Sequence, residues 1–346
     1  MAAPVTRLAY TLNHGLRVAW YTSALLLARR NEAKPTDASE ATQAARGSTT
    51  SREALFADMA RLFAQDVKNA DAGIYRLAHD WFGPLDEEVR RMRLFFNDVP
   101  AVARRRAQKS ANEPLATYRG KRPAYYLQNF HYQSDGWMSE DSAARYDMQV
   151  EVLFGGTAAA MRRQTIAPIA HHLKGRDQRS LRLLDVGAGT ARWLKDLRPA
   201  FPALPVTIAD MSEAYLSRAL AERGNEGRLT ALLAKAEALP LADSSQDIVT
   251  AIYLFHELPP KIRRAAAAEI ARVLKPGGLF VMNDSLQRGD HPPYDGMLER
   301  FPHAVHEPYY AGYLGEDLNA LFGAHGLSPV SRERAFLSTV AAFRKS

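Results

Sequence analysis

Apolar residues recur at helical spacing in the first part of the chain and cluster into short runs in the second part. Within residues 1–30 the apolar positions lie four apart, which predicts an amphipathic helix. The stripe on this helix consists of Leu8, Leu12, Leu16 and Trp20. Residues 31–51 are rich in Ala, Ser, Thr and Gln and have few apolar anchors, so we predict a linker before the next helix.

The next helix is predicted to begin at Thr50. Thr50 and Glu53 have the spacing of a capping box, in which two side chains bind free N–H groups of the first turn. The apolar face expected to follow is made of Phe56, Met59, Phe63, Val67, Ala70 and Ile74. A polar interval over residues 104–122 begins with three arginines and predicts a solvated loop, with phosphate or lipid-headgroup binding as the alternative.

From about residue 180, short runs rich in Leu and β-branched residues alternate with helical segments. This alternation predicts a parallel sheet whose strands are connected by helices. The predicted strands cover residues 181–186, 206–209, 229–233, 248–253 and 279–282, with helices such as 212–221 and 260–274 between them. A helix around residues 314–325 and a terminal hairpin of strands 327–334 and 335–344 complete the predicted order.

Composition and charge narrow the class of protein. The 346 residues are 47% hydrophobic and 24% charged, which provides for a buried core and excludes wholesale disorder. The absence of cysteine excludes disulfides, cysteine-bound zinc and a thiol nucleophile, and agrees with a reducing, cytoplasmic location. The net charge of +7 favours anionic partners without selecting among nucleic acid, lipid and acidic cofactors.

The first helix leaves three interpretations open. No segment approaches the roughly 20 apolar residues that span a bilayer. Residues 1–30 contain no acidic side chain and end in Arg29 and Arg30. The helix therefore packs on its own protein, lies on a membrane surface or belongs to a targeting segment. A peripheral membrane contact through this helix is thus one expectation, and the oligomeric state is not predicted.

The clearest chemical signal lies at residues 183–191, which read LLDVGAGTA. A strand ends at Asp185, and Gly187 and Gly189 then make a tight turn into a helix. Glycines in such a turn let the backbone approach a ligand closely, because no side chain is in the way. Asp210 closes the next strand, where a carboxylate can accept both hydroxyls of a ribose. This order of strand, turn, helix and acid predicts a nucleoside cofactor.

Arg192 stands where dinucleotide sites have their third glycine, which argues against a nicotinamide cofactor. With this turn, the sequence resembles the class I S-adenosylmethionine-dependent methyltransferases, especially the branch that includes the ubiquinone and menaquinone C-methyltransferases. The resemblance covers about residues 157–346, and its motifs LLDVGAGTA, TIADMS, AKAEALPLADSSQDIV, YLFHELP and ARVLKPGGLFVMND follow the family's order. It implies an α/β fold with a Rossmann-like, mostly parallel sheet whose last strand is antiparallel.

The resemblance implies S-adenosylmethionine as the cofactor and S-adenosylhomocysteine as the product. The residues implied to surround its methionine part, ribose and adenine are Asp185, Gly187, Ala188, Gly189, Asp210, Met211, Ala236 and Glu237. Lys235 departs from the family, which usually has Asp there to contact the adenine amine. A charged lysine cannot accept a hydrogen bond, so that contact is expected from the backbone or from Glu237, or Lys235 points to solvent.

Side chains that follow the strand ends are candidates for catalysis and acceptor binding, because parallel sheets bind ligands beyond their carboxyl edge. The expected catalytic residues are His256, Glu257 and His306, with His256 and Glu257 as candidate bases after the fourth strand. The expected acceptor contacts are His131, Trp137 and Tyr146 in an aromatic cap segment, Tyr253 after the fourth strand, and Tyr309 and Tyr310 in an insertion. No metal site is expected.

The sequence thus predicts a helical N-terminal region (1–122), a cap segment (123–156) and a methyltransferase domain (157–346). The expected reaction is methyl transfer to carbon or oxygen of a small, apolar or aromatic acceptor such as a quinone, a phenol or a lipid. A non-catalytic cofactor-binding or assembly subunit is the alternative. Nucleic-acid methylation is a further, disfavoured alternative. The HPPY segment at 291–294 resembles the proline-rich motif of amino-group methyltransferases that act on nucleic acids or proteins, but that motif follows the fourth strand and this segment follows the fifth. The basic charge also forms no recognisable nucleic-acid module.

Overall fold

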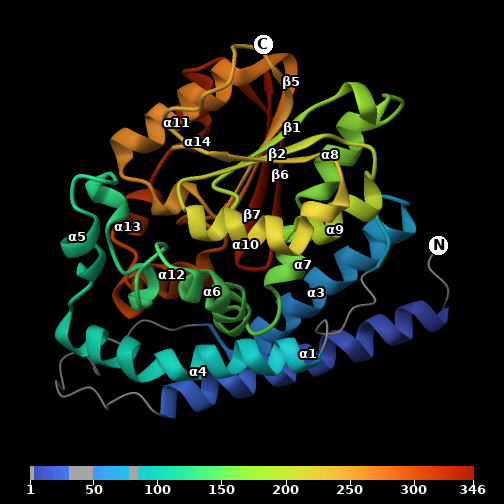
Figure 1. Ribbon diagram of the computed structural model, residues 1–346. Coiled ribbons are helices and arrows are strands. Elements are labelled where there is room, and N and C mark those ends of the chain that lie inside the picture. Colours follow the sequence, from blue (N-terminus) through green and yellow to red (C-terminus); the bar gives the residue numbers. More distant parts are fainter. Residues whose placement is uncertain (1–3, 31–49, 78–84) are drawn as a thin grey trace.

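The computed structural model describes residues 4–30, 50–77 and 85–346, and a seven-stranded sheet lies at its centre (Figure 1). The strand order is β3-β2-β1-β4-β5-β7-β6, and only β7 runs antiparallel to the others. The strands are β1 (Leu183–Val186), β2 (Val206–Asp210), β3 (Leu229–Leu233), β4 (Gln246–Ile252), β5 (Leu274–Ser285), β6 (Leu327–Ala335) and β7 (Ser338–Lys345). The predicted α/β class, sheet and terminal hairpin are therefore confirmed.

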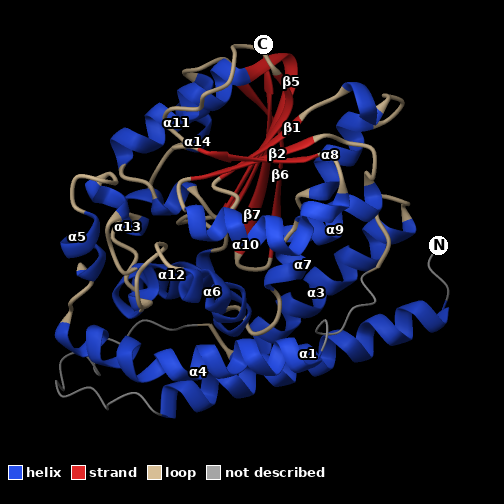
Figure 2. Ribbon diagram, viewed as in Figure 1, coloured by secondary structure: helices blue, strands red, loops and turns tan. Residues whose placement is uncertain are grey.

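Helices cover both faces of the sheet because successive strand residues alternate between two buried cores (Figure 2). Leu183 packs into one core and Leu184 into the other, and Ile248 and Val249 divide in the same way. The first core includes residues of α8 (Ile166–Leu173), α9 (Leu194–Ala200) and α10 (Glu213–Arg223). The second includes residues of α11 (Pro260–Val273) and α14 (Leu318–Gly323).

The N-terminal helices form a layer beyond the carboxyl ends of the strands (Figure 1). The long helices α1 and α4 lie side by side there, and α6 lies between them and the sheet. The helices of this part are α1 (Pro4–Arg30), α3 (Arg52–Asp71), α4 (Leu85–Gln108), α5 (Glu113–Tyr118), α6 (Glu140–Leu153) and α7 (Ala158–Arg163). The insertion between β5 and β6 contains two short helices, α12 (Asp295–Ala304) and α13 (Tyr310–Tyr313). The helix predicted around residues 314–325 follows them and is shorter than predicted, because it covers only α14.

Single 3₁₀ turns connect many of these elements. They are η1 (Ala124–Tyr126), η2 (Phe130–Tyr132), η3 (Gln178–Ser180), η4 (Gly224–Glu226), η5 (Phe255–Glu257) and η6 (Pro292–Tyr294). Turns η2 and η5 carry residues of the candidate site. The HPPY segment around η6 is structural, because the Tyr294 hydroxyl is buried and donates to Asp58 on α3 at 2.6 Å.

Two details of α3 differ from the prediction. The helix is capped by Ser51, whose Oγ accepts a hydrogen bond from the Ala54 N–H at 3.1 Å, so the predicted Thr50 cap is wrong by one residue. Thr50 instead donates to the backbone carbonyl of Pro293. Phe56 is 54% exposed, because the buried face of α3 is partly polar and includes Asp66. The predicted linker covers residues 31–51. Of these, residues 31–49 lie outside the described ranges, and only residues 50 and 51 are described.

The arginine run at 104–106 also differs from the prediction, because it lies in α4 rather than in a solvated loop. Arg105 is buried and donates to the Tyr132 carbonyl at 2.9 Å and to the Ser134 hydroxyl at 2.7 Å. It also lies 2.8 Å from the carboxylate of Glu113. Tyr132 and Ser134 lie far from Arg105 in the sequence, so the local charge pattern could not show that this arginine is buried and the run helical.

Helix α1 packs on the protein through the side opposite to its apolar stripe. Leu8, Leu12, Leu16 and Trp20 are 43–62% exposed. The buried side consists of Tyr10, Asn13, His14, Arg17, Tyr21, Ala24 and Ala28. The helix is attached by polar contacts of Tyr10 and Arg17 and by apolar packing of Tyr21 and Ala24, so it packs on its own protein through a face that the stripe did not indicate. In the part of the chain that the structure describes, no helix is long and apolar enough to cross a bilayer.

The main attachment of the N-terminal helices is a buried cluster around Asp66 of α3. Asp66 is fully buried and accepts hydrogen bonds from four side chains: Tyr10 on α1, Tyr75 just after α3, and Arg163 and Gln164 at the end of α7. Arg163 binds it with Nε at 2.9 Å and Nη2 at 2.5 Å, and also reaches Asp196 of α9 at 3.0 Å. Tyr10 and Tyr75 donate their hydroxyls at 2.5 Å.

We expect Asp66→Asn to lower the free energy of unfolding by about 3 kcal/mol, because it removes the buried carboxylate that binds Arg163 and leaves only Asp196 to balance the guanidinium. The measurement is urea unfolding followed by circular dichroism. Asp177→Asn is the matched control, since Asp177 forms an exposed pair with Arg179 at 3.9 Å and should cost less than about 0.5 kcal/mol. Equal effects of the two substitutions would contradict the role of the cluster.

Candidate cofactor cleft and acceptor cavity

The glycine turn after β1 has the tight geometry that its sequence predicts. Gly187 and Gly189 adopt left-handed φ values of +68° and +55°. A Cβ atom on Gly187 would lie 2.8 Å from Leu254 Cδ1, so a larger residue would displace the Leu254 side chain in addition to straining the backbone. The carboxylate of Asp210 fixes the turn, because it accepts the Gly189 N–H at 2.8 Å and the Ser212 N–H at 2.8 Å.

Two buried carboxyl groups stand at this edge of the sheet. Asp185 accepts a hydrogen bond from Thr250 Oγ1 at 2.7 Å and from Trp193 Nε1 at 2.7 Å. Burial nevertheless raises the pKa of Asp185 to about 7. Burial also raises the pKa of Asp210, against the effect of the N–H groups that bind it. A carboxylate offers about four lone-pair sites, so Asp210 can accept a further donor such as a ribose hydroxyl besides these N–H groups.

A cleft above the turn brings most of the predicted cofactor residues together. Its wall contains Asp185, Gly187, Ala188, Gly189, Asp210, Met211 and Ala236, and the cap adds Tyr126, Phe130, Trp137 and Tyr146. Glu237 does not line the cleft, because its carboxylate accepts the Tyr125 hydroxyl at 2.8 Å. Lys235 is exposed and also lies outside the wall, which agrees with the solvent-facing alternative.

The cleft residues fit S-adenosylmethionine. The glycine turn leaves room for close backbone approach, and aromatic rings of the cap provide apolar walls for a purine. The two buried carboxyl groups suit a ligand that carries positive charge and hydroxyl groups. The cleft thus offers contacts for the adenine, the ribose and the positively charged methionine part of the cofactor that the sequence implies.

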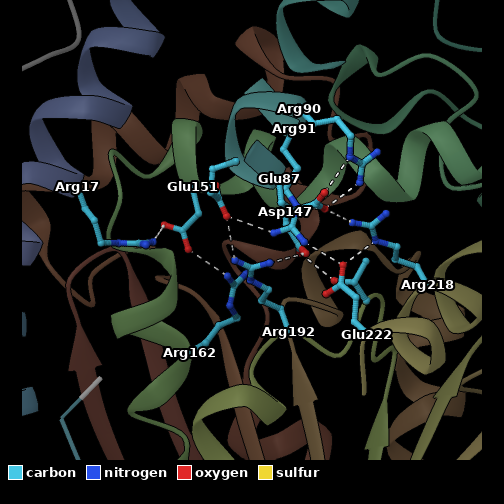
Figure 3. A network of polar contacts seen from close by, with 12 residues as sticks. Arg17, Glu87, Arg90, Arg91, Asp147, Glu151, Arg162, Arg192, Arg218 and Glu222 are labelled. Atoms are coloured by element: carbon cyan, nitrogen blue, oxygen red, sulfur yellow. Dashed lines mark hydrogen bonds and ion pairs between the residues drawn. The ribbon is translucent and has the colours of Figure 1, made fainter. Parts of the chain in front are cut away.

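An ion-pair network holds the cap over this cleft (Figure 3). Asp147 on α6 accepts the Thr190 hydroxyl at 2.8 Å and lies 3.5 Å from the guanidinium of Arg192. Arg192, which lines the cleft, also reaches Glu88 on α4 at 3.8 Å. Glu151 on α6 binds arginines of α1 and α7 at 3.3 Å each. The network therefore connects the N-terminal helices to the glycine turn.

A second cavity of about 340 Å³ adjoins the cleft. Tyr146, Tyr253 and Glu257 line both spaces. Most of the other wall residues are apolar and come from the end of α6, from the insertion between β5 and β6 and from the turn between β6 and β7: Val150, Leu153, Phe154, Met297, Leu298, Phe301, Ala304, Val305 and Leu337. The cavity reaches Arg29 at the end of α1, which is exposed.

His256 and Glu257 lie where the fourth strand ends, as predicted, and both line the second cavity. The Nδ1 atom of His256 lies 2.5 Å from Asp284 Oδ1, and no other described side chain binds its Nε2. Burial alone would lower the pKa of His256, but the Asp284 carboxylate outweighs burial and raises it to about 9. Burial, helped by the neighbouring Glu307 carboxylate, raises the pKa of Glu257 well above its usual value.

The acceptor contacts expected from the sequence divide into two groups. His131, Tyr146, Tyr253 and Tyr310 line the second cavity, whereas Trp137 lines the cofactor cleft. His306 and Tyr309 line neither space, because both side chains turn toward Gln128, at 2.7 Å and 2.9 Å respectively. Burial lowers the pKa of His306. The structure thus does not bring His306 to the site where the sequence analysis places it.

Sequence reasoning missed Asp284 and Glu307. Asp284 follows the predicted fifth strand closely enough to reach the same sheet edge as His256, so the rule on strand ends could have found it. Glu307 stands in an irregular loop beside the predicted His306, and the direction of a loop side chain has no signal in the sequence.

Comparisons with known proteins agree with this geometry. Residues 183–278 match the methyltransferase domain family. The chain is 35% identical over 142 residues to the ubiquinone/menaquinone biosynthesis C-methyltransferase of Methylobacterium nodulans, which covers 40% of this chain and 54% of that protein. It is 31% identical over 147 residues to the malonyl-[acyl-carrier protein] O-methyltransferase of Alcanivorax borkumensis, covering 39% and 49%. The chain therefore spans about half the length of the curated relatives it matches.

Among solved structures, magnesium protoporphyrin IX methyltransferase from Synechocystis with bound S-adenosylmethionine is similar at a TM-score of 0.39 and 14% identity, covering 54% of this chain and 79% of that one. The matched family, the relatives and the order of strands agree with one another. Residues 183–278 thus match the methyltransferase domain family, and the chain resembles the class I S-adenosylmethionine-dependent methyltransferases of the ubiquinone/menaquinone C-methyltransferase branch.

Proposed function

We propose that this protein transfers the methyl group of S-adenosylmethionine to carbon or oxygen of a small, apolar acceptor. The observation that carries the proposal is the shared wall of Tyr146, Tyr253 and Glu257 between the cofactor cleft and the second cavity. Two ligands in these spaces would meet at this wall. An apolar or aromatic molecule such as a quinone, a phenol or a lipid suits the largely apolar lining.

The chain contributes mainly alignment to such a reaction. S-adenosylmethionine supplies a methyl group on a positively charged sulfur. Asp210 and the glycine turn hold the nucleoside end, Asp185 faces the cleft as a counter-charge, and the cap keeps water out. Holding two reactants in line contributes roughly 7–11 kcal/mol, more than the roughly 3–5 kcal/mol expected of a general base.

His256 suits the role of a hydrogen-bond donor to the acceptor. Asp284 fixes its ring through Nδ1, and its other nitrogen has no partner among the described residues that line or surround the cavity. A donor at this place would orient an acceptor oxygen toward the cofactor cleft. Glu257, at the boundary of the two spaces, is the second polar contact available to the acceptor.

We further propose that α1 rests on a membrane surface. Its exposed residues from Leu8 to Leu27 include no charged side chain, whereas Arg29 and Arg30 at its end are exposed. An apolar helix face next to basic residues binds the boundary between headgroups and acyl chains of anionic lipids. The second cavity reaches Arg29, so an apolar acceptor could enter from that surface.

The decisive test of the reaction uses purified protein, cofactor labelled in its methyl group and fractionated cell extract. We expect label to appear in an extractable small molecule, whose analysis identifies both acceptor and atom. Label found only in nucleic acid or protein would overturn the proposed acceptor class. Tight cofactor binding with no labelled product in any aqueous or lipid fraction would instead support the non-catalytic alternative.

We expect Asp210→Ala to weaken S-adenosylmethionine binding at least about 30-fold, because a hydrogen bond to a charged group contributes about 1.5–3 kcal/mol and the turn also loses its anchor. Isothermal titration calorimetry measures the change. Lys235→Ala is the control, since this exposed side chain lies outside the cleft, and it should bind the cofactor like the wild type. Wild-type affinity in the Asp210→Ala variant would refute the assignment of the cleft.

Cofactor affinity is also expected to depend on the ionisation of Asp185. Its pKa of about 7 leaves the free protein partly protonated at neutral pH, and a positively charged ligand favours the ionised form. The dissociation constant should therefore fall about tenfold between pH 6 and pH 8 and level off above. Asp185→Asn removes the titrating group, so its curve reports the remaining pH dependence. Parallel curves for the two proteins would exclude Asp185 as the cause.

Membrane binding is expected to depend on the apolar stripe of α1. The double substitution Leu12→Glu and Leu16→Glu should lower sedimentation with anionic phospholipid vesicles more than about tenfold, because each buried leucine contributes about 1.5–3 kcal/mol. The double substitution Leu220→Glu and Leu233→Glu adds the same charge at exposed leucines elsewhere and should leave binding nearly unchanged. Failure of the wild type to bind vesicles of any composition would refute this contact.

A further inference from the structure

Three side chains from distant parts of the sequence converge beside the second cavity. His131 comes from η2, Glu257 ends η5, and Glu307 comes from the loop between α12 and α13. One potential ligand atom from each lies within 4.8 Å of the others. His131 and Glu257 line the cavity, and Glu307 stands behind them.

Glu307 has an unusual environment for a carboxylate. It is 1% exposed, and neither of its oxygens accepts a hydrogen bond with good geometry in the described part of the chain. Its close neighbour is the Nε2 atom of His131, at 2.7 Å from Oε1. A buried carboxylate without hydrogen bonds is costly, so such a group in a folded protein calls for a partner such as an ion or a water molecule.

The raised pKa of His256 places one positive charge beside this cluster, but that charge is paired with Asp284. Neither Glu257 nor Glu307 forms an ion pair with a lysine or an arginine in the described ranges, although most buried carboxylates of the cap do so. His256, the adjacent imidazole, is already bound to Asp284. Two carboxylates thus face one histidine in a space next to an apolar cavity.

We propose that His131, Glu257 and Glu307 bind one divalent transition-metal ion, of the class of Mn²⁺, Fe²⁺ or Zn²⁺. One imidazole nitrogen and two carboxylates form a donor set that such ions favour. A metal ion with bonds of about 2.1 Å keeps its ligands about 3–3.5 Å apart, so Glu257 has to approach the other two by about 1–2 Å. Glu257 lies at a cavity wall, where a torsional change of its side chain meets open space.

Two of the three ligands, His131 and Glu257, line the cavity, so an ion held by them would lie at the cavity wall, where an acceptor could supply a further ligand. An acceptor oxygen bound at such a position would be polarised and would lose its proton more readily. This role rests on the proposed function, whereas binding of the ion does not. The sequence gives no sign of the site, because its three residues share no local spacing.

The test uses full-length, untagged protein that has been freed of metal with a chelator. Titration with Mn²⁺, followed by electron paramagnetic resonance and calorimetry, should show one ion per chain with a dissociation constant below about 100 µM. Glu307→Gln keeps the shape of the side chain and removes its charge, and it should weaken Mn²⁺ binding at least tenfold. Glu237→Gln is the matched control, because that carboxylate lies outside the cluster, and it should bind Mn²⁺ like the wild type.

Circular dichroism shows whether each variant is folded, and Glu257→Gln serves as a second variant if Glu307→Gln does not fold. Absence of Mn²⁺, Zn²⁺ and Mg²⁺ binding to the wild type would overturn the proposal, as would unchanged Mn²⁺ binding in both glutamine variants. Calorimetry with S-adenosylmethionine on the same samples separates this result from the proposed function. Metal binding without cofactor binding would support the metal site and refute the methyltransferase reaction.

Discussion

The cofactor cleft depends on the ion pairs that join the cap to the glycine turn. The sheet provides the floor of the cleft, but most of its aromatic wall residues precede the first strand. Arg192 and Thr190 hold these parts together by binding Asp147 on α6. Buried ion pairs add little net stability compared with apolar packing, and their best-supported use is to fix one arrangement of the parts they join. The position of the cap is therefore specified by charge, at the edge of the ligand space.

The same preference for polar attachment explains which parts of the fold the sequence could predict. The strands and their order of appearance follow from local hydrophobic runs and turn residues, and the structure has all of the predicted strands. Helix α1 was predicted as an element, but its orientation was not. Its inward face binds Asp66 and Glu151, which lie far away in the sequence, so the visible apolar stripe indicated the exposed side instead.

The candidate site also contains residues that the sequence could place and residues that it could not. Asp185, the glycines and Asp210 belong to a continuous motif, and their positions in the cleft follow from the strands that carry them. Residues on irregular segments could be placed near the sheet edge but not oriented. His306 was chosen for its chemistry, yet it turns toward Gln128, while the neighbouring Glu307 points inward to His131. The backbone path of this loop decides which of the two adjacent side chains points inward, and that path depends on tertiary contacts.

Arg192 has a consequence for how cofactor preference could change in evolution. Glycine at this position would complete the fingerprint of dinucleotide-binding folds within the turn. In this protein the same change would remove the guanidinium that reaches both Asp147 and Glu88, and these acids would remain buried without it. A change from one nucleotide class to another would thus require simultaneous changes on α6, which lines the cleft, and on α4, whose Glu88 lies outside it. The glycine turn thus has two roles, because it forms the cofactor cleft and also holds α4 and α6 through Arg192. A substitution in the turn that changed the ligand would therefore also weaken the attachment of these helices.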